Sequence, residues 1–204
     1  MDLHRNLVLY LDTNLFLDIT RNRNNEFTRT LFHEIKCDQY EAVTSTFTLL
    51  EIVQEEQERA YTEKELIHNK RSFDEIRSTM HERKLTKSTI EDVYDSVWKN
   101  LKPYTETEKI SVQYLDEEGW DFAIDIQRKM DISASDAIHV AVAFKYGCDI
   151  FVTSDNQLIR NCSKHFKPQK LLFSTPSELK RKEKSLEKKT ILKLIKASEA
   201  FKNA

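Results

Sequence analysis

Apolar runs and helically spaced apolar residues alternate along most of the chain. The apolar run at residues 7–11 is continuous, which is typical of a strand buried on both faces of a sheet, and the run at 149–153 repeats the pattern. Between these runs, apolar residues recur at helical spacing. The predicted strands are residues 7–11, 41–45, 110–114, 149–153 and 171–173. The predicted helices are residues 27–35, 49–64, 88–101, 117–130 and 135–147.

This alternation of strands and helices predicts an α/β fold. Such chains form a mostly parallel central sheet with helices on both faces, which is a three-layer α/β/α architecture. The segment 55–103 is helical in pattern, with apolar spacing that continues through Met80, and it enlarges the helical part of the domain. We expect Gly147 to end one helix as a left-handed cap. In sheets of this kind, ligands bind beyond the carboxyl ends of the strands.

Charge is segregated toward the C-terminus. The chain carries 32 Lys and Arg against 34 Asp and Glu, which gives a net charge of −2. Residues 177–204 hold nine Lys and Arg against four Glu, so they carry +5 and residues 1–176 carry −7. We therefore divide the chain into a domain at 1–176 and a basic amphipathic helical tail at 177–204. The tail either packs as a solvated terminal helix or contacts RNA or a partner. Its helically spaced apolar residues are Ile191, Leu194, Ile195 and Phe201.

The composition excludes several classes of protein. With 39% hydrophobic and 32% charged residues, the 204-residue chain can bury a core beneath a charged surface, so wholesale disorder is excluded. Its two glycines, Gly119 and Gly147, are too far apart to form a Walker-type phosphate loop or a dinucleotide-binding loop. Cofactors that bind through such glycine-rich loops are therefore excluded.

The cysteines and the N-terminal sequence indicate a cytoplasmic protein. The three cysteines are an odd number without C-x-x-C spacing, so they fit neither a disulfide framework nor a zinc site. The apolar run at 7–11 is too short for a signal peptide and is followed at once by an acid. No segment is long and apolar enough for a membrane span. We therefore expect a reducing cytoplasmic environment and no membrane contact.

Four acidic residues occur at one predicted edge of the sheet. Asp12 directly follows the first strand, and Asp155 follows the strand at 149–153. Glu51 lies near the start of the helix after the second strand, and Asp136 opens the helix before the fourth strand. Because the carboxyl ends of parallel strands meet at one edge, we expect these four side chains to share a cleft.

Helix capping is the alternative explanation for each carboxylate taken alone. Acidic residues are favoured at helix N-termini because they interact with free backbone N–H groups and with the helix dipole. Thr48 and Glu51 have the spacing of a capping box. Ser135 and Ser154 directly precede two of the acids and are candidate caps. Capping does not explain why an acid recurs beside the end of each successive strand.

The predicted cluster of carboxylates needs a positive charge. Three or four negative groups in one cleft repel one another unless a cation neutralises them. Oxygen ligands suit hard divalent ions such as Mg²⁺ or Mn²⁺, and these ions also bind phosphate groups. The acidic residues therefore predict a divalent metal site and indicate metal-dependent phosphodiester chemistry.

Four sequence segments around these acids resemble the PIN domain and, within it, the VapC-like endoribonucleases. The resemblance covers residues 7–176, and the order and spacing of the four segments agree with the family. A single apolar run followed by Asp is common in α/β proteins, whereas four such motifs in order are specific. The segments are LYLDTNLF at 9–16, TSTFTLLE at 44–51, SDAIHVAVA at 135–143 and FVTSD at 151–155.

The resemblance implies an endoribonuclease that depends on Mg²⁺ or Mn²⁺. In this reading Asp12 and Asp136 bind the metal directly. Asp155 binds it directly or through water, and Glu51 binds it or orients the attacking water. The activated water attacks the scissile phosphorus in line, and the ribose 3′ oxygen leaves. The implied catalytic and metal-binding residues are Asp12, Glu51, Asp136 and Asp155.

Other residues near these motifs are expected to support the site. Asn14, Thr153 and Ser154 match polar positions that accompany the acids. Arg21 and Arg23 follow the first motif and are candidate contacts to RNA phosphates, with exposed loop charges as the alternative. The resemblance also implies an RNA substrate, a homodimer and, for a toxin, an antitoxin or another protein partner. Small toxin-type PIN proteins are shorter and have a briefer helical section between the second and third motifs. The extra helical length at 55–103 and the basic tail suit binding of a partner, extension of a dimer surface or selection of a substrate.

Two other functions remain open. A non-catalytic RNA-binding or regulatory scaffold would keep the fold, but it has no need of four converging carboxylates. A haloacid-dehalogenase-like phosphatase also places Asp after its first strand, but it needs a second acid two residues later, where this chain has Asn14. His139, one turn after Asp136, either faces the cleft or is a core residue, and the core is the commoner position for a lone histidine on an apolar helix.

Overall fold

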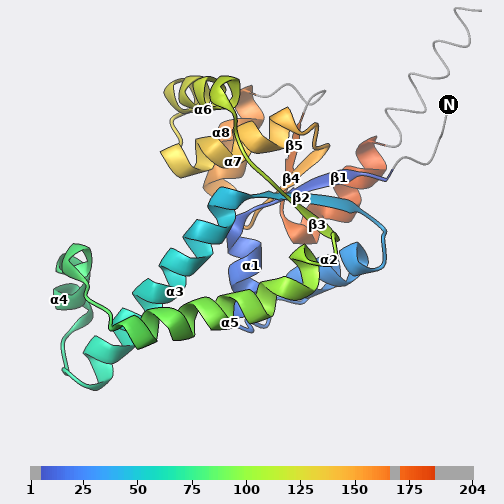
Figure 1. Ribbon diagram of the computed structural model, residues 1–204. Helices are drawn as coiled ribbons and strands as arrows, with labels where there is room; N and C mark the ends of the chain where they lie inside the picture. The colour runs from blue at the N-terminus through green and yellow to red at the C-terminus, as the bar shows by residue number, and fades with distance from the viewer. Residues whose placement is uncertain (1–5, 166–170, 187–204) are drawn as a thin grey trace, which may run out of the picture.

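The computed structural model describes residues 6–165 and 171–186 of the chain. Five strands form one sheet in the order β3-β2-β1-β4-β5, and every neighbouring pair is parallel (Figure 1). In the central strand, Tyr10 lies opposite Val43 of β2 and Phe151 of β4. The predicted α/β class and all five predicted strands are confirmed. The strands are β1 Val8–Leu11, β2 Glu41–Ser45, β3 Ile110–Gln113, β4 Ile150–Val152 and β5 Leu172–Ser174.

Helices connect these strands and cover both faces of the sheet (Figure 1). Each predicted helix is present, although several extend beyond the predicted bounds. Gly147 follows α7 with a φ of +65°, which confirms the predicted left-handed cap. The helices that the sequence pattern predicted are α2 Glu26–Lys36, α3 Thr46–Ile67, α5 Lys87–Thr105, α6 Glu117–Met130 and α7 Ala134–Lys145.

The sequence pattern did not indicate two short helices, α1 Thr13–Thr20 and α8 Asn156–His165. Each begins close to the end of a strand: one residue separates β1 from α1, and three residues separate β4 from α8. Asp12 caps α1 by accepting a hydrogen bond from its first N–H group at 2.8 Å. Asp155 caps α8 by accepting bonds from two N–H groups of its first turn, at 2.7 and 3.0 Å. The acids at the strand ends therefore also start helices.

Alternation along β1 explains how the sheet supports two hydrophobic cores. Tyr10 contributes to the core formed with α6, α7 and α8, whereas Leu9 and Leu11 contribute to the core formed with α1, α2 and α5. Both sets are almost completely buried. A continuous apolar run is therefore needed, because successive side chains point to opposite faces of the sheet. The three layers predicted from the sequence are visible in Figure 1.

The enlarged helical section extends beyond the sheet. Helix α3 is 22 residues long, so it measures about 33 Å at 1.5 Å per residue. Helix α5 packs along it, and the short helix α4, Phe73–Ser78, lies at its far end (Figure 1). A 3₁₀ turn at Met80–Glu82 leads back toward α5. The predicted helical segment 55–103 therefore forms a projection as well as part of a layer.

The start of the predicted basic tail packs on the domain. After a 3₁₀ turn at Pro176–Glu178, Leu179 is 2% exposed and joins the core beside α2. Lys180 forms an ion pair with Glu34 at 3.1 Å. The rest of the predicted tail helix, from residue 187, lies outside the described residues, so the tail and its boundary stay predictions. Within the described ranges, no helix is long and apolar enough to cross a membrane.

Candidate active site

A cleft of about 250 Å³ opens at the carboxyl edge of the sheet. The loops and helices that follow β1, β2 and β4 supply most of its lining. This is where ligands bind in parallel α/β sheets. The structure places all four predicted carboxylates in the cleft, together with Glu55 and the imidazole of His139. The four are Asp12, Glu51, Asp136 and Asp155.

Asp12 is the most deeply buried acid of the cleft. It lies between the last residue of β1 and the first residue of α1, and it is 6% exposed. Burial raises the pKa of this carboxyl, although the nearby His139 and the hydroxyl of Thr153 act in the opposite direction. A negative charge at this position is therefore only partly compensated by the protein.

The predicted supporting residues hold Asp12 in place. The side-chain amide of Asn14 donates to Asp12 Oδ2 at 2.6 Å and to Thr153 Oγ1 at 2.8 Å. The hydroxyl of Thr153 donates to the same carboxylate oxygen at 2.6 Å. Ser154 contributes through its backbone, because its N–H group donates to Asn14 Oδ1 at 3.0 Å. These contacts join the ends of β1 and β4 and fix the direction of the Asp12 carboxylate.

Glu51 is held from three sides. The hydroxyl of Thr13 donates to its Oε2, the hydroxyl of Ser135 donates to its Oε1, and His139 Nε2 lies 2.7 Å from Oε2. Burial raises the pKa of Glu51, but the hydrogen bonds and the charge of His139 outweigh burial and lower this pKa to about 2. Glu51 is therefore a carboxylate in a fixed orientation.

His139 belongs to the site, although the sequence alone left its position open. Its side chain is 2% exposed, with Nε2 toward Glu51 and Nδ1 2.7 Å from the hydroxyl of Tyr10. Since the ionised carboxylate of Glu51 can only accept hydrogen bonds, His139 Nε2 carries a proton and donates it to this bond. Burial lowers the pKa of His139, but the bond to Glu51 and the charge of Asp12 outweigh it and raise the pKa. In the sequence, the indication that His139 faces the cleft was its position one helical turn after Asp136.

Asp136 and Asp155 lie at the open side of the cleft. Asp136 is in the first turn of α7, where Ser133 Oγ donates to its Oδ2 at 2.7 Å. Asp155 is exposed and accepts the backbone bonds that cap α8. Compared with Asp12, these two carboxylates are more accessible to a ligand from solvent.

The predicted caps are partly wrong. Ser45 rather than Thr48 caps α3, because the helix begins at Thr46, three residues before the predicted start, and Thr48 N donates to Ser45 Oγ at 3.0 Å. Ser133 caps α7 in place of Ser135, whose hydroxyl is bonded to Glu51. Both expected hydroxyls lie inside the helices.

The two predicted RNA-contacting arginines form ion pairs. Arg21, which follows α1, contacts Glu56 at 2.6 Å and Glu55 at 3.2 Å. Arg23 lies 3.5 Å from the buried Asp18 and is 53% exposed. Glu55 lines the cleft, so Arg21 is near its rim. A contact of either arginine with RNA stays a prediction.

The donor atoms of the cleft suit a hard divalent cation. Among the described lining residues there are five carboxylates and one imidazole, and no Lys or Arg. In the part of the chain that the structure describes, however, no three Asp, Glu, His or Cys side chains lie close enough together to hold a metal ion. Glu51 and Asp136 are instead directed to neighbouring donors. Joint coordination therefore requires some of these side chains to turn toward one another.

Comparison with known proteins agrees with this architecture. The structure of FitAB bound to a DNA fragment is similar over 82% of this chain and 94% of that chain, with 14% identity and a TM-score of 0.51. FitAcB from Neisseria gonorrhoeae is similar over 82% of this chain and 97% of that chain, also with 14% identity and a TM-score of 0.51. Both likenesses show the fold. Comparison with curated proteins gave no match.

A sequence model of one family covers the sheet and the cleft. The PIN domain family model matches residues 9–164, from β1 through α8, and this range includes every cleft residue named above. The match spans more than half of the chain. The chain belongs to the PIN domain family.

Proposed function

We propose that this protein is a metal-dependent endoribonuclease. The observation that carries the proposal is the convergence of four carboxylates, from four separate segments of the chain, on one cleft without a lining Lys or Arg among the described residues. PIN domains are generally nucleases, and those nucleases generally use divalent metal ions. The preference for RNA rests on the resemblance of the four motifs to VapC-like endoribonucleases.

The residues of the cleft divide into metal-binding and positioning groups. Asp12, Asp136 and Asp155 would hold Mg²⁺ or Mn²⁺, because two of them are accessible and the third carries a charge that the protein only partly compensates. The bound ion would supply Lewis acidity and an activated water for attack on phosphorus. Glu51 is available to bind or to orient the water, since its carboxylate is ionised and held by three donors.

His139 and Tyr10 act behind Glu51 as positioning residues. His139 joins the Glu51 carboxylate to the Tyr10 hydroxyl through its two ring nitrogens. This chain of contacts reaches from the cleft into the core, where Tyr10 is fully buried. Partners of this kind fix the orientation of a ligand carboxylate, and their loss costs about 10- to 100-fold in metal affinity or activity.

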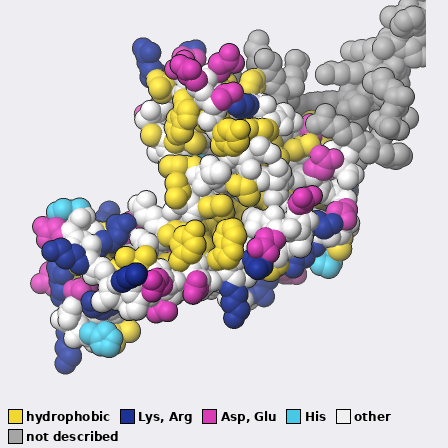
Figure 2. Space-filling view, viewed as in Figure 1, with side chains coloured by type: hydrophobic (Ala, Val, Ile, Leu, Met, Phe, Trp, Pro, Cys, Tyr) yellow, Lys and Arg dark blue, Asp and Glu magenta, His cyan; other side chains and the backbone are white. Residues whose placement is uncertain are grey.

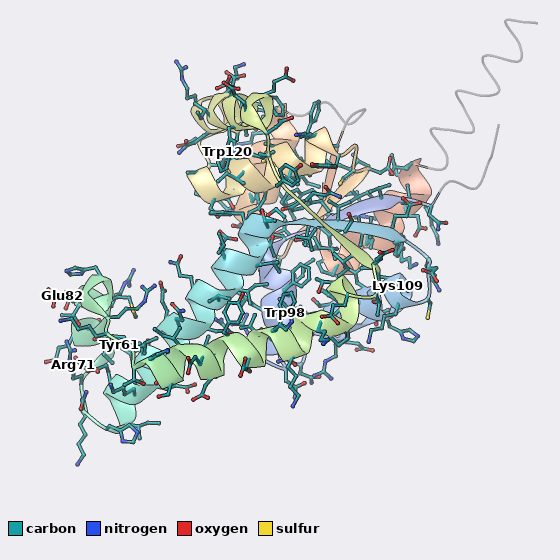
Figure 3. All side chains as sticks on the ribbon, viewed as in Figure 1. Tyr61, Arg71, Glu82, Trp98, Lys109 and Trp120 are labelled. Carbon is teal, nitrogen blue, oxygen red and sulfur yellow. The ribbon has the colours of Figure 1, made fainter. Side chains whose placement is uncertain are left out.

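A protein partner would suit the apolar face that extends from α6 to α5. Figure 2 shows apolar side chains gathered on one face from α6 to α5, and Figure 3 shows Trp120 and Trp98 on these helices. Trp98 is 41% and Trp120 is 46% exposed. We propose an antitoxin as the occupant, in line with the motif resemblance and with FitAB, whose structure is a complex. A homodimer through this face is the alternative outcome. The mass of the protein purified alone, compared with its mass after co-expression with the antitoxin, distinguishes the two.

The proposed cytoplasmic location is supported by the thiols. Cys37, Cys148 and Cys162 are all free, which agrees with a reducing environment. Burial raises the pKa values of Cys148 and Cys162 to about 12, so these two thiols are unreactive core residues.

The proposed nuclease is tested by RNA cleavage with matched aspartate variants. We expect the full chain with Mn²⁺ or Mg²⁺ to cut a mixed pool of structured and single-stranded RNAs. Asp12→Asn and Asp136→Asn should abolish the cuts, whereas Asp92→Asn, on the exposed surface of α5, should keep them. Equal cleavage by all three variants would refute the proposed active site. RNA binding without cleavage by the wild type would favour the scaffold.

A further inference from the structure

The far end of the α3–α5 projection is basic, in contrast to the cleft. We call residues 64–87 the arm; they include the end of α3, helix α4 and the start of α5 (Figure 1). The arm holds seven Lys and Arg against four Asp and Glu, so its formal charge is +3. Figure 2 shows Lys and Arg side chains around this projection. The arm therefore attracts anions, whereas the cleft repels them.

Two arginines of the arm face inward and hold it in shape. Arg71 contacts Glu65 at 3.2 Å and donates to the hydroxyl of Thr79 at 2.8 Å (Figure 3). Arg83 contacts Glu58 of α3 at 3.1 Å. These contacts neutralise the two guanidinium groups and explain the structural role of both arginines. They do not give a structural role to the other cations of the arm.

Three other cations of the arm are exposed to solvent, and one of them lies next to an exposed aromatic ring. Lys70, Arg77 and Lys84 are exposed and make no ion pair within the described residues. Phe73 is 67% exposed at the start of α4, and Arg77 lies four residues later on the same face of that helix. Ile76 is 1% exposed and anchors α4 from its other face. The fold therefore buries one side of α4 and leaves the ring of Phe73 and the charge of Arg77 exposed on the other.

Helix α3 connects this surface rigidly to the cleft. It carries Glu51 near its start and ends at Ile67, which lies 16 residues and about 24 Å further along the helix axis. A nucleic acid strand advances about 3.4 Å per nucleotide in a duplex, so this distance corresponds to roughly seven nucleotides. A single RNA can therefore reach both sites.

We propose that the arm binds the RNA substrate at a distance from the cleavage site. Lys70, Arg77 and Lys84 contact backbone phosphates, and Phe73 stacks on an unpaired base. The inference rests on the proposed function, since it takes RNA as the substrate. It explains how a cleft lined by five carboxylates retains a polyanion, because the attraction comes from a second surface on the same helix pair. The substrate class is a structured RNA with an unpaired segment that extends beyond the cut site.

Binding of a labelled RNA hairpin tests the arm independently of cleavage. The probe is a fluorescein-labelled RNA stem with a single-stranded loop, titrated in EDTA with the full-length chain. The arm variants are Lys70→Ala with Arg77→Ala, and separately Phe73→Ala. The matched control is Arg128→Ala with Lys164→Ala, which removes one exposed arginine on α6 and one exposed lysine at the end of α8. Circular dichroism verifies that all variants are folded.

The salt dependence gives the decisive readout. Between about 50 and 200 mM salt, we expect the arm double variant to reduce the slope of log K against log salt by about 2, one for each lost phosphate contact. Its affinity should fall about tenfold, and Phe73→Ala should weaken binding with an unchanged slope. The control variant should match the wild type. Equal affinity and slope for arm and control variants would overturn the proposal.

The two proposals fail in different ways. Salt-dependent binding through the arm without any metal-dependent cleavage would refute the nuclease and keep the arm. Cleavage that depends on Asp12 but is unaffected by the arm variants, at substrate concentrations below saturation, would keep the nuclease and refute the arm. If the arm variants bind RNA normally but lose a co-purifying protein, the arm is a protein-binding surface and the RNA proposal is wrong.

Discussion

His139 Nε2 lies 2.7 Å from Glu51 Oε2, although the two residues are 88 positions apart. The contact links α7 to α3 across the cleft, and Ser135 of α7 bonds to the other oxygen of the same carboxylate. Glu51 is therefore positioned by the packing of two helices and not by its own helix alone. The orientation of this acid depends on residues that need not touch a substrate.

Replacement of His139 tests this positioning role. We expect His139→Ala to lower RNA cleavage and Mn²⁺ affinity about 10- to 100-fold, since Glu51 loses the donor that fixes its orientation. His139→Gln, which can still donate to Glu51, should recover part of both quantities. His33→Ala is the control, because His33 is exposed on α2, away from the cleft and the arm. Normal Mn²⁺ affinity in His139→Ala would contradict the role.

Removal of the Tyr10 hydroxyl tests the inner end of the same chain of contacts. Tyr10→Phe deletes the hydroxyl that lies 2.7 Å from His139 Nδ1 and leaves that buried nitrogen without this partner. We expect the free energy of unfolding to fall by about 1–2 kcal/mol in urea titrations. Tyr94→Phe, on an exposed ring of α5, should change it by less than about 0.5 kcal/mol. Equal stability of the two variants would show that the buried hydroxyl is not a significant contact.

Metal binding should stabilise the folded protein through Asp12. Burial raises the pKa of Asp12, so its ionised form costs stability at neutral pH, and a bound cation offsets this cost. We expect Mn²⁺ to raise the unfolding temperature of the wild type and of Asp92→Asn. Asp12→Asn should lose most of that increase in differential scanning calorimetry. An identical increase in all three proteins would place the bound metal elsewhere.

The low pKa of Glu51 predicts a stability change in acid. Its folded pKa is about 2 against an ordinary value of 4.5, so its contribution is present above about 4.5 and is lost as the pH falls toward 2. In EDTA, the difference in unfolding free energy between wild type and Glu51→Gln should therefore decrease across this range. A change on the order of 1–3 kcal/mol is expected from urea titrations. A difference that does not vary with pH would contradict the ion-paired state of Glu51.

The sequence predicted the sheet and the acids at its edge for a simple physical reason. Strands such as β1 are buried on both faces, so the run around Tyr10 is continuously apolar, and the polar residue that ends the run marks the strand end. Asp12 and Asp155 could be located in this way. Helix capping was the alternative explanation for these acids, and the structure shows both roles, because Asp12 and Asp155 line the cleft and also cap α1 and α8.

Other features depended on contacts between distant segments. The position of His139 could not be fixed from its own helix, since its two partners come from β1 and α3. The cap of α3 was misplaced because Ser45 is also the last residue of β2, and pattern alone does not show where the strand stops. The arm could not be identified from the sequence, because its basic residues look alike there. Only the structure shows that Arg71 and Arg83 form ion pairs, whereas cations such as Arg77 are exposed.

The central claim is hydrolysis of RNA by a metal-activated water in the acidic cleft, and the ends of the cleavage products test it most directly. In-line attack by water with departure of the 3′ oxygen predicts 5′-phosphate and 3′-hydroxyl ends, formed with Mn²⁺ and absent with EDTA or with Asp12→Asn. Products with 2′,3′-cyclic phosphate ends, or cleavage that persists in EDTA, would contradict the claim, because the ribose 2′-hydroxyl and not a metal-activated water would then be the nucleophile.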